Sequence, residues 1–344
     1  MRKKELLNQS IKEDVFQKKA TSAFFIASPL QALCAIEAIC DFEIEEYRIF
    51  VVIMPTEFRK NQIGNILTTA GYSFEIIDIS WFFYFKIPIN MILQRGNYQR
   101  AFVGHILASE LTMAALPMLQ EGGKVIYLDD GTASLSALKG YSIHLKNTFK
   151  VKATILNLLA RTKGVRLKRY VYTIYDGINN DDFIIKVNRL RHLVNNFMCQ
   201  NGSPDTVFFI GTNPEAFCEK MSVTMDIYNE YLNKVLILLR DKYSSRRIVY
   251  IPHGRDIGDD TKLLCDSFQI EYQKLDVCVE FYLLRSGINP LAVYGFGSSA
   301  LYNLKCIYPS ADIVNLMFQA RKGGLMFDVV TDYYEQHGIR TFWL

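Results

Sequence analysis

The fold class is decided by the stretch SAFFIASPLQALCAI, which occupies residues 22–36. Residues 22–28 form a short apolar run, which is typical of a buried strand. Pro29 then suits the first turn of a helix, and Ala32, Ala35 and Ile36 keep helical spacing after it. A strand followed at once by a helix opens a βα unit, so we predict an α/β protein.

The same alternation continues through the first half of the chain. Strands are predicted at residues 48–54, 73–79, 101–104 and 124–128, the last of which ends at Asp129. Helices are predicted between these strands: one begins at Thr56, and another follows the strand at 101–104 and ends at Leu119. Because parallel strands need a crossover, which is usually a helix, this order predicts a mainly parallel sheet.

A second series of alternating elements follows the loop QNGSP at residues 200–204. A chain of 344 residues is too long for one ordinary core, so we place a domain boundary there and expect domains at 1–200 and 201–344. The prediction is an α/β fold of two doubly wound, Rossmann-like domains with an inter-domain cleft. In the second domain we expect strands at 206–210, 247–251 and 292–295, and helices at 228–243, 261–268, 278–286 and 299–307.

Charge is distributed unevenly along the chain. The formal charge of +4 is too small to indicate a nucleic-acid partner, yet no Asp or Glu occurs from Gly131 to Tyr175. Residues 139–169 form a basic segment, and residues 155–159 within it could form an apolar face. This combination favours contact with an anionic membrane surface, and the alternative is a solvated basic helix or loop. The basic residues are Lys139, Lys146, Lys150, Lys152, Arg161, Lys163, Arg166, Lys168 and Arg169.

The cysteines indicate a reducing compartment. Their number is odd, they are scattered, and no CxxC pair occurs, which argues against a disulfide framework and against a zinc site. We therefore expect a cytoplasmic protein, peripheral at most on the inner membrane. The apolar run at residues 23–36 follows acidic residues and is interrupted by Pro29, so it does not predict a membrane span.

Two adjacent carboxylates follow the predicted strand at 124–128. In open α/β sheets, ligands gather at the carboxyl ends of the strands, so Asp129, Asp130 and Gly131 are candidates for a site. A carboxylate there would accept the proton of an attacking hydroxyl as a general base. The alternative is an aspartate that caps a helix in a turn.

A histidine and an arginine follow the strand at 247–251. Arg255 would hold the oxygens of a phosphate while protonated His253 donates a hydrogen bond or a proton to it. The alternative is a structural histidine. The other histidines, His105, His144, His192 and His337, have less favourable settings.

Small residues and two hydroxyls connect the strand at 292–295 to the next helix. Gly295, Gly297, Ser298 and Ser299 would form an anion site, because the N–H groups of a first helical turn and the serine hydroxyls both point at a bound phosphate. Ordinary helix capping is the alternative. The chain has no Walker A, HExxH or GxSxG motif and no evident DxD metal motif, so we expect no cofactor and no catalytic metal.

These residues resemble the bacterial sialyltransferases, most closely glycosyltransferase family 52, which includes lipooligosaccharide sialyltransferases. The resemblance spans nearly the whole chain and implies the two-domain GT-B architecture. One departure is Gly254, which stands where the wider group has the Pro of a His-Pro motif. The matching elements are Ser28-Pro29-Leu30-Gln31 with Glu37, Phe209-Ile210-Gly211, His253 with Arg255, and Ser298 with Ser299.

The resemblance also implies residue roles. The C-terminal domain would bind the CMP donor, with His253 assisting departure of CMP and with Arg255, Gly211, Gly295, Gly297, Ser298 and Ser299 around it. Ser28, Pro29 and Gln31 would lie on the acceptor side. The resemblance implies that the base is Asp129 or Asp130. The alternatives are Asp226 and Glu230, which correspond to a carboxylate upstream of the histidine in family 52.

The expected reaction is an inverting, metal-independent transfer of N-acetylneuraminic acid from CMP-Neu5Ac to a terminal galactose of a bacterial surface glycan, with an α2,3 linkage. The acceptor would belong to an O-antigen, a lipooligosaccharide or a capsule intermediate. Some of these glycans are linked to a lipid. One alternative is a GT-B transferase that uses a different donor, namely CMP-Kdo, a further CMP-nonulosonate or a UDP-hexose. A second alternative is a non-catalytic partner that binds a glycan or a nucleotide. The sequence leaves the oligomeric state open, a homodimer included.

Overall fold

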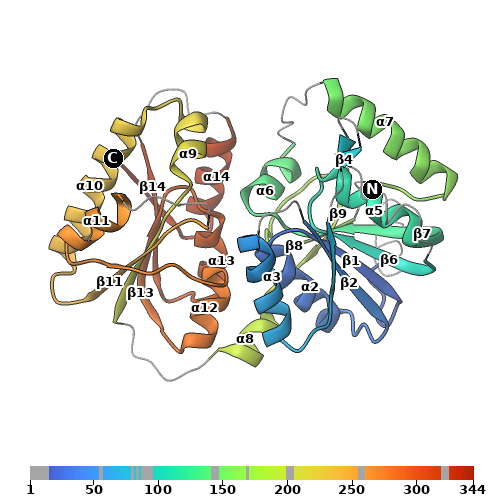
Figure 1. Ribbon diagram of the computed structural model, residues 1–344, viewed down its shortest axis with the longest axis horizontal. Coiled ribbons are helices and arrows are strands. Elements are labelled where there is room, and N and C mark those ends of the chain that lie inside the picture. The colour runs from blue at the N-terminus through green and yellow to red at the C-terminus, as the bar shows by residue number, and fades with distance from the viewer. Residues whose placement is uncertain are drawn as a thin grey trace. The chain divides into compact units, whose positions relative to one another are not determined.

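A computed structural model describes residues 15–53, 57–78, 81–82, 85–86, 96–140, 147–167, 170–198, 205–254, 260–318 and 325–344. The chain divides into two compact units, Met1–Asn195 and Asn196–Leu344 (Figure 1). Within the described residues, no helix is both long enough and apolar enough to cross a membrane.

The first unit is built on a seven-stranded sheet in the order β3-β2-β1-β6-β7-β8-β9, and every neighbouring pair is parallel. Strand β1 lies in the interior of this sheet, paired with β2 on one side and with β6 on the other. The strands are β1 (Ser22–Ile26), β2 (Tyr47–Ile53), β3 (Glu75–Asp78), β6 (Tyr98–Val103), β7 (Leu119–Tyr127), β8 (Tyr170–Thr173) and β9 (Ile184–Val187).

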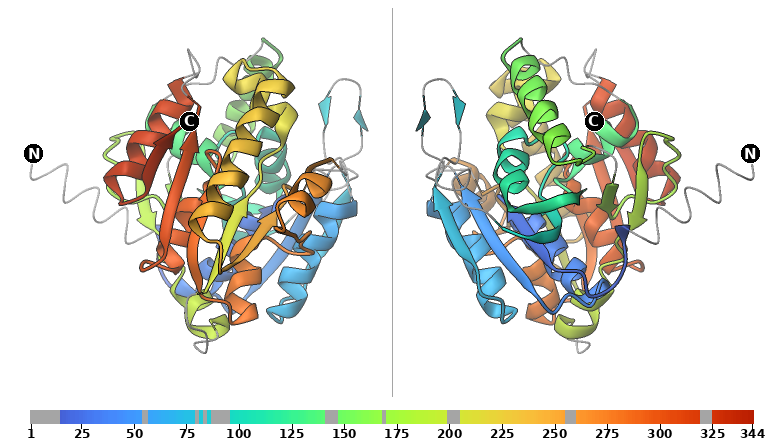
Figure 2. Two further views of the ribbon diagram at one scale, coloured as in Figure 1. Left: turned by 90° about the vertical axis from the view of Figure 1, so that its left-hand side faces the viewer. Right: turned by 90° about the vertical axis from the view of Figure 1, so that its right-hand side faces the viewer.

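Helices cover both faces of this sheet because its strands are apolar on both faces. Alternate residues of β1, Ala23 and Phe25, belong to the core shared with α5 and α7, and Phe24 stacks on Phe102 on the opposite face. The helices are α2 (Pro29–Asp41), α3 (Glu57–Thr69), α5 (Ser109–Ala115), η1 (Leu116–Met118), α6 (Thr132–Leu138), α7 (Asn147–Thr162) and α8 (Arg191–Phe197). A separate antiparallel pair joins β4 (Trp81–Phe82) to β5 (Phe85–Lys86) (Figure 2).

The second unit carries a six-stranded, wholly parallel sheet in the order β12-β11-β10-β13-β14-β15. This is the doubly wound order 3-2-1-4-5-6 within the unit. Its strands are β10 (Thr206–Ile210), β11 (Arg247–Ile251), β12 (Glu271–Tyr272), β13 (Pro290–Gly295), β14 (Asp312–Met317) and β15 (Arg340–Trp343).

The helices of the second unit are divided between the two faces of its sheet. Residues of α9, α10 and α11 share one core with Val207 and Phe209 of β10. Figure 1 shows α12, α13 and α14 together on the opposite side of the strands. These helices are α9 (Pro214–Met221), α10 (Met225–Lys242), α11 (Asp260–Ser267), α12 (Val279–Ser286), α13 (Ser299–Ile307) and α14 (Leu325–Gln336).

Most predicted helices and strands are observed, and the clearest difference is the end of the helix before β7. Helix α2 begins at Pro29 and α13 covers residues 299–307, as predicted. The predicted helix up to Leu119 is wrong, because the α-helix ends at Ala115, Pro117 lies in a 3-10 turn, and β7 already begins at Leu119. The predicted loop at 200–204 lies outside the described residues.

Candidate functional site

In the first unit, candidate residues gather where the central strands end. Ser28 follows β1, Gly104 follows β6 and Asp130 follows β7, and these three strands are neighbours in the sheet. Because all are parallel, their carboxyl ends share one edge, and the chain leaves β1 and β6 toward different sides there. Sheets of this kind bind ligands at that switch point.

Asp130 is held by hydrogen bonds from the start of α2. Its Oδ1 accepts from Gln31 Nε2 at 2.8 Å and from Ser28 Oγ at 3.3 Å. Within the described residues, no hydrogen bond reaches its other oxygen, and the residue is only half-buried. Ser28 is also the N-cap of α2, since its hydroxyl accepts from the Gln31 N–H. The sequence-predicted residues Ser28, Pro29, Gln31 and Asp130 are therefore brought together, with one carboxylate oxygen left for a ligand.

A glycine makes this arrangement sterically feasible. A Cβ atom at Gly104 would lie 2.0 Å from Gln31 Oε1, which is far inside any allowed contact. Gln31 is buried, and its Oε1 accepts from the Ala27 N–H at 2.6 Å, so the amide has no room to retreat without losing a bond. Gly104 thus fixes the amide that positions Asp130.

Asp129 is turned the other way and is fully buried. Its Oδ1 lies 2.6 Å from Thr173 Oγ1, and its Oδ2 accepts from the Ile174 N–H at 2.6 Å. Burial raises the pKa of Asp129 to about 7, and the two hydrogen bonds only partly oppose that shift. This carboxyl joins the end of β7 to the end of β8 and has no exposed oxygen to offer an acceptor.

Gly131 lets the chain turn sharply after the two aspartates. It has φ 70° and ψ −144°, a conformation that is essentially restricted to glycine. The Asp130 N–H then donates to Ser134 Oγ at 2.9 Å in the first turns of α6. The helix-capping alternative considered for this motif does not describe it, because neither aspartate is the N-cap of α6; that position is Gly131.

In the second unit, the corresponding edge lies where β10 and β13 end. Gly211 follows β10, and its N–H donates to the Ile251 carbonyl at 2.8 Å. A Cβ at Gly211 would lie 2.6 Å from the hydroxyl oxygen of Tyr250, so only glycine fits. Gly295 pairs with Ile210 in the sheet, which brings the connections after these two strands to the same switch point.

The connection from β13 to α13 is braced by two residues from later in the chain. Gly297 has φ 57°, and its N–H donates to Oδ1 of the fully buried Asn315 at 3.0 Å. The Tyr334 hydroxyl donates to the Ser298 carbonyl at 2.8 Å. Ser298 is the N-cap of α13, with its hydroxyl accepting from the Ala300 N–H at 3.3 Å, and Ser299 begins the helix. Both serines are partly exposed.

The remaining predicted residues have different settings. His253 follows β11 and is partly exposed, whereas Arg255 lies outside the described residues. Asp226 is exposed in the first turn of α10, and Glu230 is exposed on the same helix and paired with Lys234 at 2.6 Å. Of the four carboxyls considered as a base, Asp130 is the one held half-buried at a strand end.

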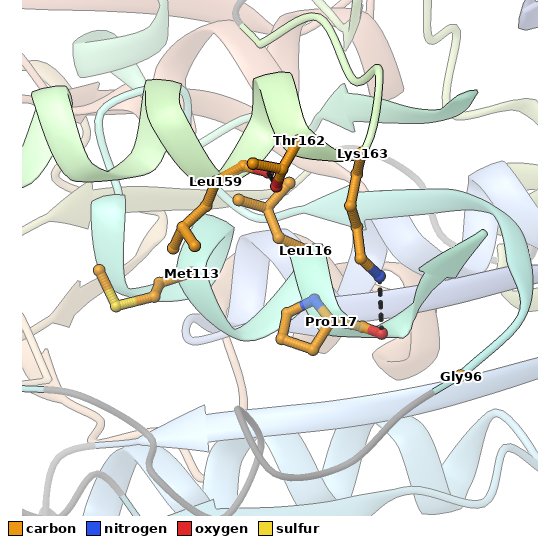
Figure 3. A pocket seen from close by; sticks show the side chains of 7 residues that line it. All are labelled: Gly96, Met113, Leu116, Pro117, Leu159, Thr162 and Lys163. Carbon is orange, nitrogen blue, oxygen red and sulfur yellow. Dashed lines mark hydrogen bonds between the residues drawn. The ribbon is translucent and has the colours of Figure 1, made fainter. Parts of the chain in front are cut away.

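A cavity with a volume of about 390 Å³ lies elsewhere in the first unit. Figure 3 shows that it lies between η1 and the end of α7, where Lys163 donates to the Pro117 carbonyl at 3.1 Å. This part of the basic segment also exposes apolar side chains, since Leu158 is 64% exposed. The lining residues are Gly96, Met113, Leu116, Pro117, Leu159, Thr162 and Lys163.

Sequence reasoning missed several residues at these strand ends. Gly104 is the last residue of a predicted strand and His105 directly follows it, and this position at a strand end is the signal that would have selected them. The His105 Nδ1 accepts from the Leu107 N–H at 3.1 Å, so the neutral ring carries its proton on Nε2. Asn315 and Tyr334 had no such signal, because they act on Gly297 and Ser298 from elements that are distant in the sequence.

Comparisons with known proteins identify the fold. No family model and no curated protein matches the sequence. An α/β-galactoside α-2,3-sialyltransferase from the luminous marine bacterium Photobacterium phosphoreum covers 94% of this chain and 99% of its own, with 12% identity and a TM-score of 0.53. A candidate UDP-N-acetylglucosamine 2-epimerase from Listeria monocytogenes covers 94% and 90%, with 9% identity and a TM-score of 0.57.

A third structure, the GT-B domain of a sialyltransferase from Photobacterium damselae, covers 94% of this chain and all of its own at 10% identity, with a TM-score of 0.49. The first two likenesses extend over almost the whole of both chains. The chain therefore has the GT-B fold of two parallel-sheet α/β units.

Proposed function

We propose that this protein is an inverting sialyltransferase that uses a CMP-activated sialic acid. The observation that carries the proposal is the Asp130 carboxylate, which Gln31 and Ser28 hold at a strand end while its second oxygen stays available. The fold, which is also that of a solved α-2,3-sialyltransferase, and the resemblance of the motifs to family 52 support it further.

Asp130 is the proposed general base. The acceptor hydroxyl oxygen attacks the anomeric carbon while the bond from that carbon to the CMP phosphate oxygen breaks. The hydroxyl proton passes to Asp130, and the bonding electron pair leaves with CMP. The bonds from Gln31 and Ser28 to Oδ1 keep Oδ2 directed at the acceptor, so proton transfer needs no reorientation of the carboxylate.

The second unit is proposed to bind the donor and to stabilise the departing CMP. His253 would donate a proton or a hydrogen bond to the phosphate, and Arg255 would pair with its oxygens. The Gly297–Ser298 turn and the N-terminus of α13 would supply further N–H donors. These groups offset the phosphate charge, which is why we propose that the transfer needs no metal and no cofactor.

The acceptor is proposed to be a terminal galactose of a bacterial surface glycan, joined through an α2,3 linkage. A lipid-linked acceptor would be reached from a membrane surface, and α7 offers a suitable contact. Its side chains Ile155, Leu158 and Leu159 are 42%, 64% and 43% exposed, and no acidic residue occurs from 131 to 175. We propose that this face of α7 lies on anionic lipid.

The test is release of CMP from CMP-Neu5Ac by the purified protein, with and without EDTA and with a panel of galactose-terminated acceptors. The proposal predicts release that survives EDTA, that one acceptor stimulates, and that Asp130→Asn abolishes. Glu121→Gln is the matched control, because Glu121 is an exposed carboxylate on β7. No release from any CMP-nonulosonate, together with turnover of UDP-N-acetylglucosamine, would instead assign the chain to a different sugar-nucleotide chemistry.

A further inference from the structure

A second polar cluster lies on α2, toward the end opposite to Ser28. Glu37 and Asp41 are one helical turn apart and therefore share a face of α2. His192, in the first turn of α8, faces them. One carboxylate oxygen from each acid and one ring nitrogen of His192 all lie within 4.8 Å of one another.

Glu37 is the unusual member of this cluster, because it is fully buried and only half satisfied. Its Oε1 accepts from the Leu193 N–H at 2.6 Å. Its Oε2 is buried and has no hydrogen-bond partner within the described residues. Since a buried carboxylate oxygen without a partner is costly, this atom calls for an occupant that the protein chain does not supply.

Asp41 and His192 lie beside the Glu37 carboxylate. The His192 Nε2 lies 3.1 Å from Asp41 Oδ1, and the Tyr172 hydroxyl donates to Asp41 Oδ2 at 2.6 Å. Outer hydrogen bonds of this kind, from Tyr172 to Asp41 and from Leu193 to Glu37, are what fixes carboxylate ligands in metal sites.

The charge of the cluster is not balanced. Within the described residues, no Lys or Arg forms an ion pair with Glu37 or Asp41, and His192 is the one basic side chain paired there. The cluster therefore sets two acidic side chains beside one histidine, with no lysine or arginine paired to them in the part of the chain that the structure describes.

We propose that Glu37, Asp41 and His192 form a binding site for a divalent transition-metal cation of the Mn²⁺ or Zn²⁺ class. One imidazole nitrogen and two carboxylate oxygens are a donor set that such ions accept, with water completing the coordination. The ion would fasten α2 to α8. It takes no part in glycosyl transfer, and the inference stands on the first unit alone, whether or not the proposed function holds.

The test uses the full chain, freed of metal and held at pH 8, with no nucleotide present. Mn²⁺ is titrated and its free fraction followed by electron paramagnetic resonance, and Zn²⁺ is titrated with the melting temperature as the readout. We expect saturation near one equivalent, a higher melting temperature, and at least tenfold weaker binding in His192→Ala and Asp41→Asn. Tyr172→Phe, which removes only an outer bond, should weaken binding by about 10- to 100-fold.

Glu121→Gln serves as the control, because it removes an exposed carboxylate outside the cluster and should bind as the parent does. Should His192→Ala fail to fold, judged by circular dichroism, Tyr172→Phe and His192→Gln carry the comparison. The proposal is overturned if neither ion binds saturably at pH 8. It is equally overturned if folded variants of His192 and Asp41 bind both ions as tightly as the parent.

Discussion

Replacing Asp129 and Asp130 separately by Ala should separate stability from catalysis. Asp129 is fully buried and bonded to Thr173 and Ile174, whereas Asp130 is only half-buried and uses one of its two oxygens in bonds to other side chains. At pH 6 the raised pKa of Asp129 leaves it largely protonated, so its removal costs neutral hydrogen bonds and not a charge.

The magnitude follows from the contacts that are lost. In Asp129→Ala the buried Ile174 N–H loses its acceptor, which costs about 1–3 kcal/mol, and the bond with Thr173 adds about 1 kcal/mol. The free energy of unfolding should therefore fall by about 2–4 kcal/mol. Asp130→Ala should cost less than about 1 kcal/mol, yet reduce transfer by about 10²- to 10⁴-fold through loss of the base.

The assay pairs urea unfolding at pH 6, followed by far-ultraviolet circular dichroism, with CMP release at saturating donor. Asp130→Asn, which keeps an oxygen for Gln31 and Ser28, shows whether the carboxylate charge itself is needed. The reasoning fails if folded Asp130→Ala transfers at the parental rate, or if Asp129→Ala unfolds at the parental urea concentration.

Three further predictions concern single groups. Gly104→Ala puts a Cβ 2.0 Å from Gln31 Oε1, so the buried amide must move and lose its bond with Asp130. We expect a lower melting temperature and, in the protein that remains folded, a kcat about tenfold lower; an unchanged kcat would exclude the positioning role. His253→Ala should lower kcat at an unchanged melting temperature, whereas a structural histidine would show the reverse. In metal-free protein, burial raises the pKa of both Asp129 and Glu37, so the folded state retains protons that the unfolded state loses above about pH 4. Stability should therefore fall as pH rises from about 4 to about 7, and Asp129→Asn should flatten that slope, as measured by urea unfolding across pH.

The alternation of apolar strands and helices was enough to predict most of the fold. Pro29 and Ser299 start their helices where the pattern placed them, since each follows directly on a buried strand. The two-residue strands β4, β5 and β12 were not predicted. Four longer strands, β8, β9, β14 and β15, were not predicted either. Three of these, β8, β9 and β15, are only four residues long, and so short a run has no clear periodicity.

The candidate site was harder to predict, because its geometry depends on distant partners. The sequence offers Asp129 and Asp130 as equals, and they differ only because β8, 44 residues later, supplies Thr173 as a partner for Asp129. The need for glycine at position 104 likewise depends on the side chain of Gln31, which lies on another element. Neither relationship leaves a trace in local spacing or composition.

The interior position of β1 has a consequence for how the protein is made. Strand β1 is among the first described segments to leave the ribosome, but its partner β6 follows only after some 78 residues, the separation of Ser22 and Arg100. Until then, the aromatic side chains of β1 lack one of their two neighbouring strands, and closing so long a loop is slow. Strand β10 repeats the situation with β13. During synthesis, each half of the nascent chain thus passes through an interval in which its most apolar strand is available to chaperones or to aggregation.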